Sequence, residues 1–159
     1  MNLDRITGRI ATIATTTFLT LAGLVATATP ASAAIVNCKD GYLTGFTSSC
    51  SRITADGDPG GVSGAVRLTT TNGNGYLRAE FQAKGEHVYL YNTTGQSAKE
   101  YLLSYTLRRY VNGSWTTVQK DTLGQGTRHI NLSIGENIPV RIFLCASGYG
   151  CATATGLKA

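Results

Sequence analysis

The seven residues Tyr-Leu-Arg-Ala-Glu-Phe-Gln at positions 76–82 alternate strictly between apolar and polar side chains. Leu77, Ala79 and Phe81 therefore fall on one face of an extended chain, and the polar residues fall on the other. Because successive side chains of a β-strand point to opposite faces, a period of two is typical of a half-buried strand. The stretch predicts a β-strand with one face in a core.

The same alternation recurs through much of the chain, with turn residues between the segments. It is found at 66–71, 87–91, 103–111, 115–119, 129–134 and 138–145. Asn112-Gly113, between two of these segments, is a strong hairpin signal. No window shows a convincing helical period. About eight strands spaced by about ten residues predict an all-β fold, a single antiparallel β-sandwich of immunoglobulin-like or jelly-roll-like type, with a small barrel as the alternative.

The first 33 residues have the pattern of an export signal. A short charged start precedes an apolar stretch at 10–26, and Ala31-Ser32-Ala33 gives the small-x-small pattern of a cleavage site. We therefore expect a signal peptide at 1–33 and one secreted, extracellular domain at 34–159. No second apolar stretch is long enough for a membrane helix, so we expect no membrane association after cleavage.

The charge balance is mildly basic, with 14 Lys and Arg against 9 Asp and Glu. No basic run is longer than Arg108-Arg109. A nucleic-acid-binding domain usually has a basic patch or stripe, so this composition argues against nucleic acid as a partner.

Four cysteines follow the predicted cleavage site, and an even number in an oxidising compartment indicates disulfides. Four cysteines permit three pairings. Spacing favours Cys38–Cys50 and Cys145–Cys151, while the other two pairings would join the N-terminal segment to the C-terminal strands. A zinc site is disfavoured because the chain has no Cys-x2-Cys. The loop at 56–61 is expected to separate the segment that carries Cys38 and Cys50 from the main strands.

No catalytic set stands out. The nucleophile pattern Gly-x-Ser-x-Gly is absent, and both histidines, His87 and His129, lie on polar strand faces. Glycoside hydrolysis needs two acids facing one cleft, and no pair is singled out among the candidates. These are Glu80, Glu86, Glu100, Asp121 and Glu136. We expect a protein that is not an enzyme and that has no cofactor or metal.

Two short motifs have ordinary explanations. Asp56 and Asp58 among glycines resemble the start of a calcium loop, but the ligand run stops there, so a plain turn is favoured. Asn92-Thr93-Thr94 matches the Asn-glycosylation pattern. We interpret it as a chance match because the export signal has bacterial character.

The aromatic residues are the best candidates for binding. Tyr89 and Tyr91 share one strand face, and Trp115 follows a hairpin turn. Such rings stack on sugars or become buried in protein interfaces. Tyr101 and Tyr105 alternate with leucines, which favours a place in the core.

Two segments, Phe81–Asn92 and Gly135–Cys145, together with Cys151, resemble small secreted actinobacterial β-sandwich proteins. Among these, the chain is similar to the adaptor subunit of the umbrella toxin particles of Streptomyces. In that family a small β-protein joins a lectin subunit to a large scaffold subunit in a complex used against competing bacteria. The resemblance implies that the N-terminal tail, here Ala34, Ile35, Val36 and Asn37, docks in the lectin's cleft.

These observations predict a non-enzymatic secreted adaptor in a toxin complex, with other secreted proteins as partners. Its binding residues would be the tail at 34–37, for which the pattern shows no strand partner in its own domain, and the tyrosine faces. The alternatives are a carbohydrate- or cell-wall-binding module that uses Tyr89, Tyr91 and Trp115, and an inhibitor of a secreted enzyme. Streptomyces-type protease inhibitors are a poor match because their reactive-loop pattern around Cys-Pro-Met is absent.

Overall fold

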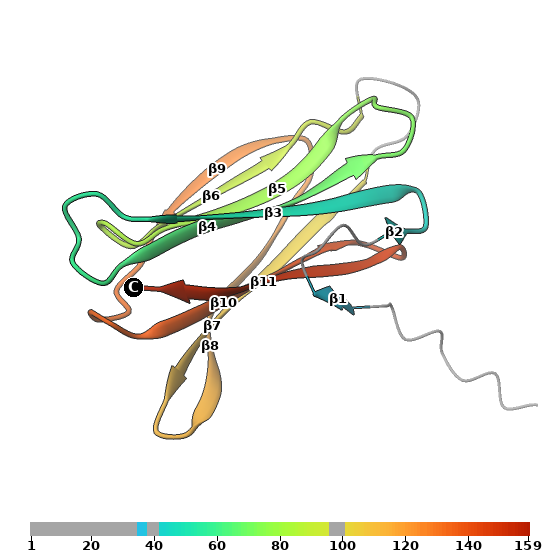
Figure 1. The fold of residues 1–159 in the computed structure, drawn as a ribbon. Helices are drawn as coiled ribbons and strands as arrows, with labels where there is room; N and C mark the ends of the chain where they lie inside the picture. The colour runs from blue at the N-terminus through green and yellow to red at the C-terminus, as the bar shows by residue number, and fades with distance from the viewer. Residues whose placement is uncertain (1–34, 38–41, 96–100) are drawn as a thin grey trace, which may run out of the picture. The chain divides into compact units, whose positions relative to one another are not determined.

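A computed structural model describes residues 35–37, 42–95 and 101–159, which all lie in one compact unit, Ala31–Ala159. The described part of the chain is all β, with no helix and hence none long and apolar enough to cross a membrane (Figure 1). The predicted signal peptide lies outside these residues. The strands are β1 (Ile35–Asn37), β2 (Tyr42–Leu43), β3 (Phe46–Thr54), β4 (Val62–Thr70), β5 (Tyr76–Gln82), β6 (His87–Asn92), β7 (Leu103–Val111), β8 (Ser114–Leu123), β9 (Gly126–Asn131), β10 (Pro139–Ala146) and β11 (Gly150–Lys158).

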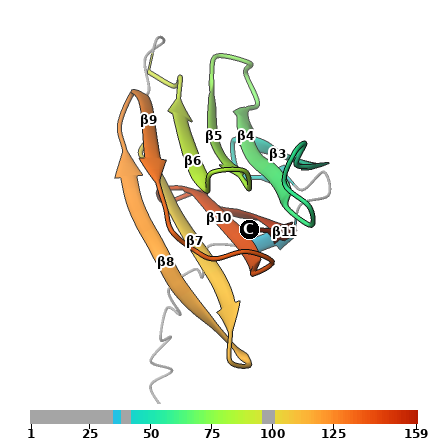
Figure 2. The same cartoon turned by 90° about the vertical axis from the view of Figure 1, so that its left-hand side faces the viewer.

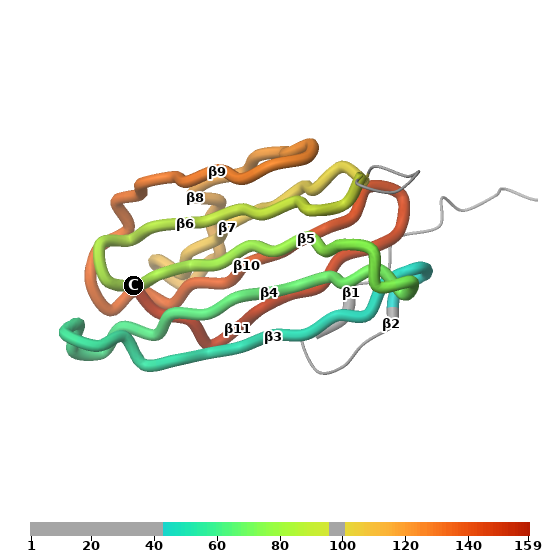
Figure 3. The backbone as a smooth tube through the Cα atoms, turned by 90° about the horizontal axis from the view of Figure 1, so that it is seen from above, coloured from blue at the N-terminus to red at the C-terminus, as the bar shows by residue number. Residues whose placement is uncertain are grey.

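The nine longer strands, β3 to β11, form one antiparallel sheet that is nearly closed. Its main path runs β8-β7-β10-β11-β4-β5-β6-β9, and β3 pairs with β4. β11 joins β4 through a single pair, Lys158 with Val62. Figure 3 shows β9, β6, β5, β4 and β3 in order on one side, and β10 lies against β4 and β5 without pairing with them. The antiparallel all-β prediction is confirmed, and the more specific β-sandwich stays a prediction.

The alternating strands bury the face that the sequence predicted. Leu77, Ala79 and Phe81 of β5 are fully buried, and so are Val88 and Leu90 of β6. Asn112 and Gly113 both have positive φ, 52° and 78°, as a tight hairpin turn requires. This turn connects β7 to β8, and Figure 2 shows their long hairpin extending past the neighbouring strands.

The expectation that residues 56–61 separate an N-terminal segment from the main strands is wrong. These residues are the loop of the β3–β4 hairpin, closed by hydrogen bonds from Ala55 N to Gly61 O and from Gly61 N to Asp58 O, both 3.0 Å long. β3 was missed because, from Cys50 onwards, all its side chains are half-buried or exposed, so its C-terminal half lacks alternation. Its pairing with β4 over nine positions places it firmly in the sheet.

Of the two tyrosines expected in the core, Tyr105 is buried in it and Tyr101 is half-buried against it. Tyr105 is 1% exposed, and Tyr101 packs edge-on against the buried Phe46 with ring centroids 4.8 Å apart. Burial raises the pKa of the Tyr105 hydroxyl, with a further contribution from the Asp121 charge. The Tyr105 ring is therefore a neutral part of the core.

The Asn-glycosylation match is buried. Asn92 is 1% exposed, and its amide donates to Tyr101 O (2.6 Å) and Leu123 O (3.1 Å). Its Oδ1 accepts hydrogen bonds from Thr94 N (3.0 Å) and Thr94 Oγ1 (2.6 Å). Because this side chain makes four hydrogen bonds inside the fold, Asn92 serves as a structural link between the segments around β6, β7 and β8.

Glu86, one of the acid candidates, closes the turn after β9. It has a positive φ of 53°, and its carboxylate accepts hydrogen bonds from the backbone N–H groups of Ile134 and Gly135, the latter 2.8 Å long. Its own carbonyl accepts from Leu132 N at 2.9 Å. The local role of Glu86 is therefore structural.

We expect Glu86→Ala to lower the free energy of unfolding by about 1–3 kcal/mol, because it leaves two backbone N–H groups without their charged acceptor. Urea unfolding measures this change. Glu136→Ala is the matched control, because Glu136 lies exposed in the adjoining turn. Equal effects of the two substitutions would contradict the role assigned to Glu86.

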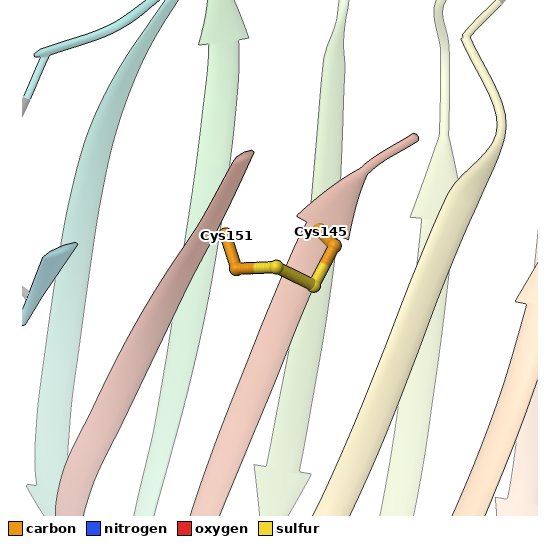
Figure 4. Close-up of a disulfide and its surroundings, with 2 residues drawn as sticks. All are labelled: Cys145 and Cys151. Carbon is orange, nitrogen blue, oxygen red and sulfur yellow. A yellow bond between two sulfur atoms is a disulfide. The ribbon is translucent and has the colours of Figure 1, made fainter. Parts of the chain in front are cut away.

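The Cys145–Cys151 disulfide is present as predicted (Figure 4). The two residues lie directly opposite each other on β10 and β11, with Cα atoms 4.0 Å apart. Closing so short a loop is worth about 2 kcal/mol in the chain-entropy model. None of the described cysteines is a free thiol, but Cys38 lies outside the described residues, so the Cys38–Cys50 pairing stays a prediction.

The expectation that the tail has no strand partner in its own domain is wrong. Ile35–Asn37 form β1, which pairs in parallel with β11, matching Ile35 with Cys151 and Asn37 with Thr153. Ala34 lies outside the described residues. A strand of three residues is too short for its sequence to predict that it pairs in parallel with a strand at the C-terminal end of the chain.

Candidate functional site

Aromatic and imidazole rings gather on the outer face of β6 and β9, which we call the tyrosine–histidine face: His87, Tyr89, Tyr91 and His129. Alternation along β6 buries Val88, Leu90 and Asn92 and leaves the other three side chains of this strand half-buried. β9 pairs with β6 so that His129 lies directly opposite Tyr89. Residues from two separate segments are thereby placed side by side.

The rings of this face pack closely. Tyr89 and His129 stack with centroids 4.4 Å apart and planes 4° from parallel, and His87 meets His129 edge-on at 4.9 Å. His87 Nδ1 lies 2.8 Å from Asn131 Oδ1. Arg78 of β5 lies over the Tyr91 ring at 5.7 Å. The result is a ring-covered surface in which one side of the Tyr89 ring is occupied by His129.

Trp115 lies elsewhere, next to the turn of the β7–β8 hairpin. Its ring is 5.3 Å from that of Tyr110, its cross-strand partner, and the Arg141 guanidinium lies 4.1 Å above it. No ring contact joins Trp115 to Tyr89 or Tyr91 in the described part of the chain. The structure thus groups the two tyrosines and leaves the predicted tryptophan in a different cluster.

That second cluster, which we call the arginine–tryptophan face, consists of Arg108, Tyr110, Trp115, Arg141 and Phe143. Arg108 on β7 lies directly opposite Arg141 on β10, and Arg141 also lies 5.1 Å from the Phe143 ring. Arg108 donates from a terminal guanidinium nitrogen to Trp115 O at 2.7 Å. Sequence reasoning missed this face because β7 and β10 are far apart in the chain.

The described acid candidates on the strands are each bound to a neighbouring side chain. Glu80 is bound to Arg78 at 2.5 Å and accepts from Gln82, and Asp121 is bound to Arg128. The Arg128 hydrogen bond, followed by that from Thr122 N, holds the pKa of Asp121 below its usual value. Glu100 lies outside the described residues. Each described carboxylate on these strands is thus engaged with a neighbour.

The described residues contain no group of three or more His, Cys, Asp or Glu side chains placed to hold a metal ion. Described residues line two hollows on the outer surface. One is lined mainly by Ser49, Ser51, Arg67 and Arg78, and the other by residues of β7 and β8 around Thr106 and Lys120. The features best suited to recognition are therefore the two ring-bearing faces.

No family model, no curated protein and no solved structure matches the chain.

Proposed function

We propose that this chain is a secreted, non-enzymatic binding module that joins other secreted proteins through the tyrosine–histidine face. The stacked Tyr89–His129 pair, 4.4 Å apart, is the observation that carries the proposal. A flat strand surface covered by partly exposed rings resembles the aromatic-rich centres of protein interfaces. In this proposal the sheet is a β-sandwich scaffold, and a Cys38–Cys50 disulfide stabilises it in addition to the Cys145–Cys151 disulfide.

One feature favours a protein partner over a sugar for this face. Stacking on a sugar needs an open ring face, and His129 covers one face of Tyr89 while Arg78 lies over Tyr91.

The specific form of the proposal is an adaptor that links a lectin subunit to a scaffold subunit in an antibacterial toxin complex. Its support is the resemblance, whose first segment, Phe81–Asn92, includes three of the four residues of the face. Docking of the tail in a lectin's cleft would then involve β1, either released from β11 or bound while still paired.

A photo-crosslinking amino acid at position 91 tests the proposal in the cells that make and secrete the protein. We expect covalent capture of a secreted partner, identified by mass spectrometry, and loss of that partner when Tyr89→Ala is added. The control carries the same crosslinker at position 110. Tyr110 is 41% exposed but lies on the arginine–tryptophan face. Equal capture from both positions, or no capture from position 91, would contradict the assignment of the binding surface to the tyrosine–histidine face.

A further inference from the structure

Two arginines with the same charge face each other, and no carboxylate of the described residues lies between them. Arg108 and Arg141 are direct cross-strand partners on β7 and β10. Like charges placed directly opposite each other in a sheet are destabilising. Burial lowers the pKa of Arg141, and the nearby charge of Arg108 lowers it further. The arrangement therefore costs stability in the protein on its own.

The chain contains a second pair of opposed arginines, whose charge it partly neutralises. Arg67 on β4 lies opposite Arg78 on β5. Arg78 is bound by Glu80, two residues further along the same strand, and Arg67 lies over the Tyr76 ring at 4.0 Å. Among the described residues, ion pairs form only at Arg78–Glu80 and Arg128–Asp121. The Arg108–Arg141 pair thus lacks the counter-charge that its counterpart has.

Both guanidinium groups are held in place by neighbouring groups. Arg141 lies over the rings of Trp115 and Phe143, at 4.1 and 5.1 Å, and Arg108 is fixed by its hydrogen bond to Trp115 O. The Nε atoms of both side chains are shielded from solvent and have no hydrogen-bond partner among the described residues. Side chains that are already ordered lose less conformational entropy when they bind a ligand.

We propose that the arginine–tryptophan face binds a sulfate or phosphate group of an anionic glycan, with the group seated at Arg108 and Arg141. Guanidinium groups present paired N–H donors that match such oxyanions. Tyr110, 41% exposed and beside Trp115, provides ring surface for the attached sugar. The proposal is independent of the proposed function, because it concerns a different face.

A glycan suits this face better than a nucleic acid. Nucleic-acid affinity depends on many phosphate contacts spread along a basic surface. Here the outer face of β7, β8 and β10 offers Arg108, Arg141 and, opposite Thr106, Lys120. A few fixed cations beside aromatic rings fit an isolated charged group on a sugar.

Binding of three dextrans tests the proposal: unmodified dextran, dextran sulfate and dextran phosphate, measured by calorimetry at low salt. We expect the protein to bind at least one charged dextran and not the neutral one, and the two charged polymers distinguish sulfate from phosphate. Arg108→Gln and Arg141→Gln should each weaken binding about tenfold, as expected for loss of one charge-assisted contact. Arg67→Gln, at the partly neutralised pair, should leave the affinity unchanged.

A further variant keeps both arginines. Thr106→Glu would place a carboxylate two residues before Arg108 on the same strand face, as Glu80 lies two residues after Arg78. We expect it to weaken binding of the charged dextran while the thermal midpoint stays the same or rises. The proposal is overturned if the neutral and charged dextrans bind alike or if none binds. It is also overturned if Arg67→Gln weakens binding as much as Arg108→Gln and Arg141→Gln do, or if a single-stranded oligonucleotide binds more tightly than both charged dextrans.

Discussion

Asn92→Ala should lower the free energy of unfolding by about 3–4 kcal/mol, since each buried polar group left without a partner costs about 1–3 kcal/mol. The substitution leaves the Leu123 carbonyl and the Thr94 backbone N–H without the partner that Asn92 provides, and it leaves the Thr94 hydroxyl donor and the Tyr101 carbonyl with their mutual 3.4 Å hydrogen bond. Thermal unfolding should show a midpoint lower by about 10 °C. The loss would be large relative to the total stability expected of one domain.

Two further variants separate hydrogen bonding from volume. Asn92→Leu keeps the bulk of the side chain but removes its hydrogen bonds, so it should be destabilised to a similar extent. Asn131→Ala removes an exposed asparagine whose side chain contacts His87, and it should change the stability by less than about 1 kcal/mol. If Asn92→Leu were as stable as the parent protein, the buried network would not be the stabilising element.

Gly64→Ala should destabilise the protein by about 2 kcal/mol or more, and Gly64→Val by a larger amount. A Cβ atom at this position would lie 2.5 Å from Leu157 Cδ2 and 2.6 Å from Ser51 O. Gly64 therefore lies where β4 contacts both β3 and the end of β11 too closely to leave room for a side chain. Valine has a higher β-strand propensity than glycine. Propensity alone would therefore predict that Gly64→Val raises the free energy of unfolding.

Urea denaturation of both variants measures the effect. The control is Ser49→Val, which introduces the same side chain at an exposed position of β3. We expect the control to be neutral or slightly stabilising. Gly64→Val as stable as the control would show that β4 and β11 do not approach as closely as described.

Alternation predicted the strands whose two faces differ most. β5, β6 and β10 bury every second side chain, and most of these side chains are apolar, so their buried faces could be predicted from the sequence. β11 could not, because its residues are small and three consecutive positions, Ala152 to Ala154, are buried. A strand that is covered over successive residues has no period of two to detect.

The candidate sites were predictable only within single strands. Alternation along β6 predicted that Tyr89 and Tyr91 share a face. The stack with His129 depends on pairing between β6 and β9, which are separated in the sequence by β7 and β8. The opposition of Arg108 and Arg141 likewise depends on the register of β7 with β10. Such long-range registers follow from packing of the whole sheet, which local patterns do not encode.

The mass of the native secreted species tests the central claim, that the chain is a binding module joined to other proteins through the tyrosine–histidine face. Analytical ultracentrifugation of protein purified from culture medium should show an assembly much heavier than this domain. The Tyr89→Ala, Tyr91→Ala double variant should sediment as a folded monomer, and Tyr110→Ala should sediment like the parent protein. A parent protein that sediments as a lone monomer, with no co-purifying partner, would contradict the account.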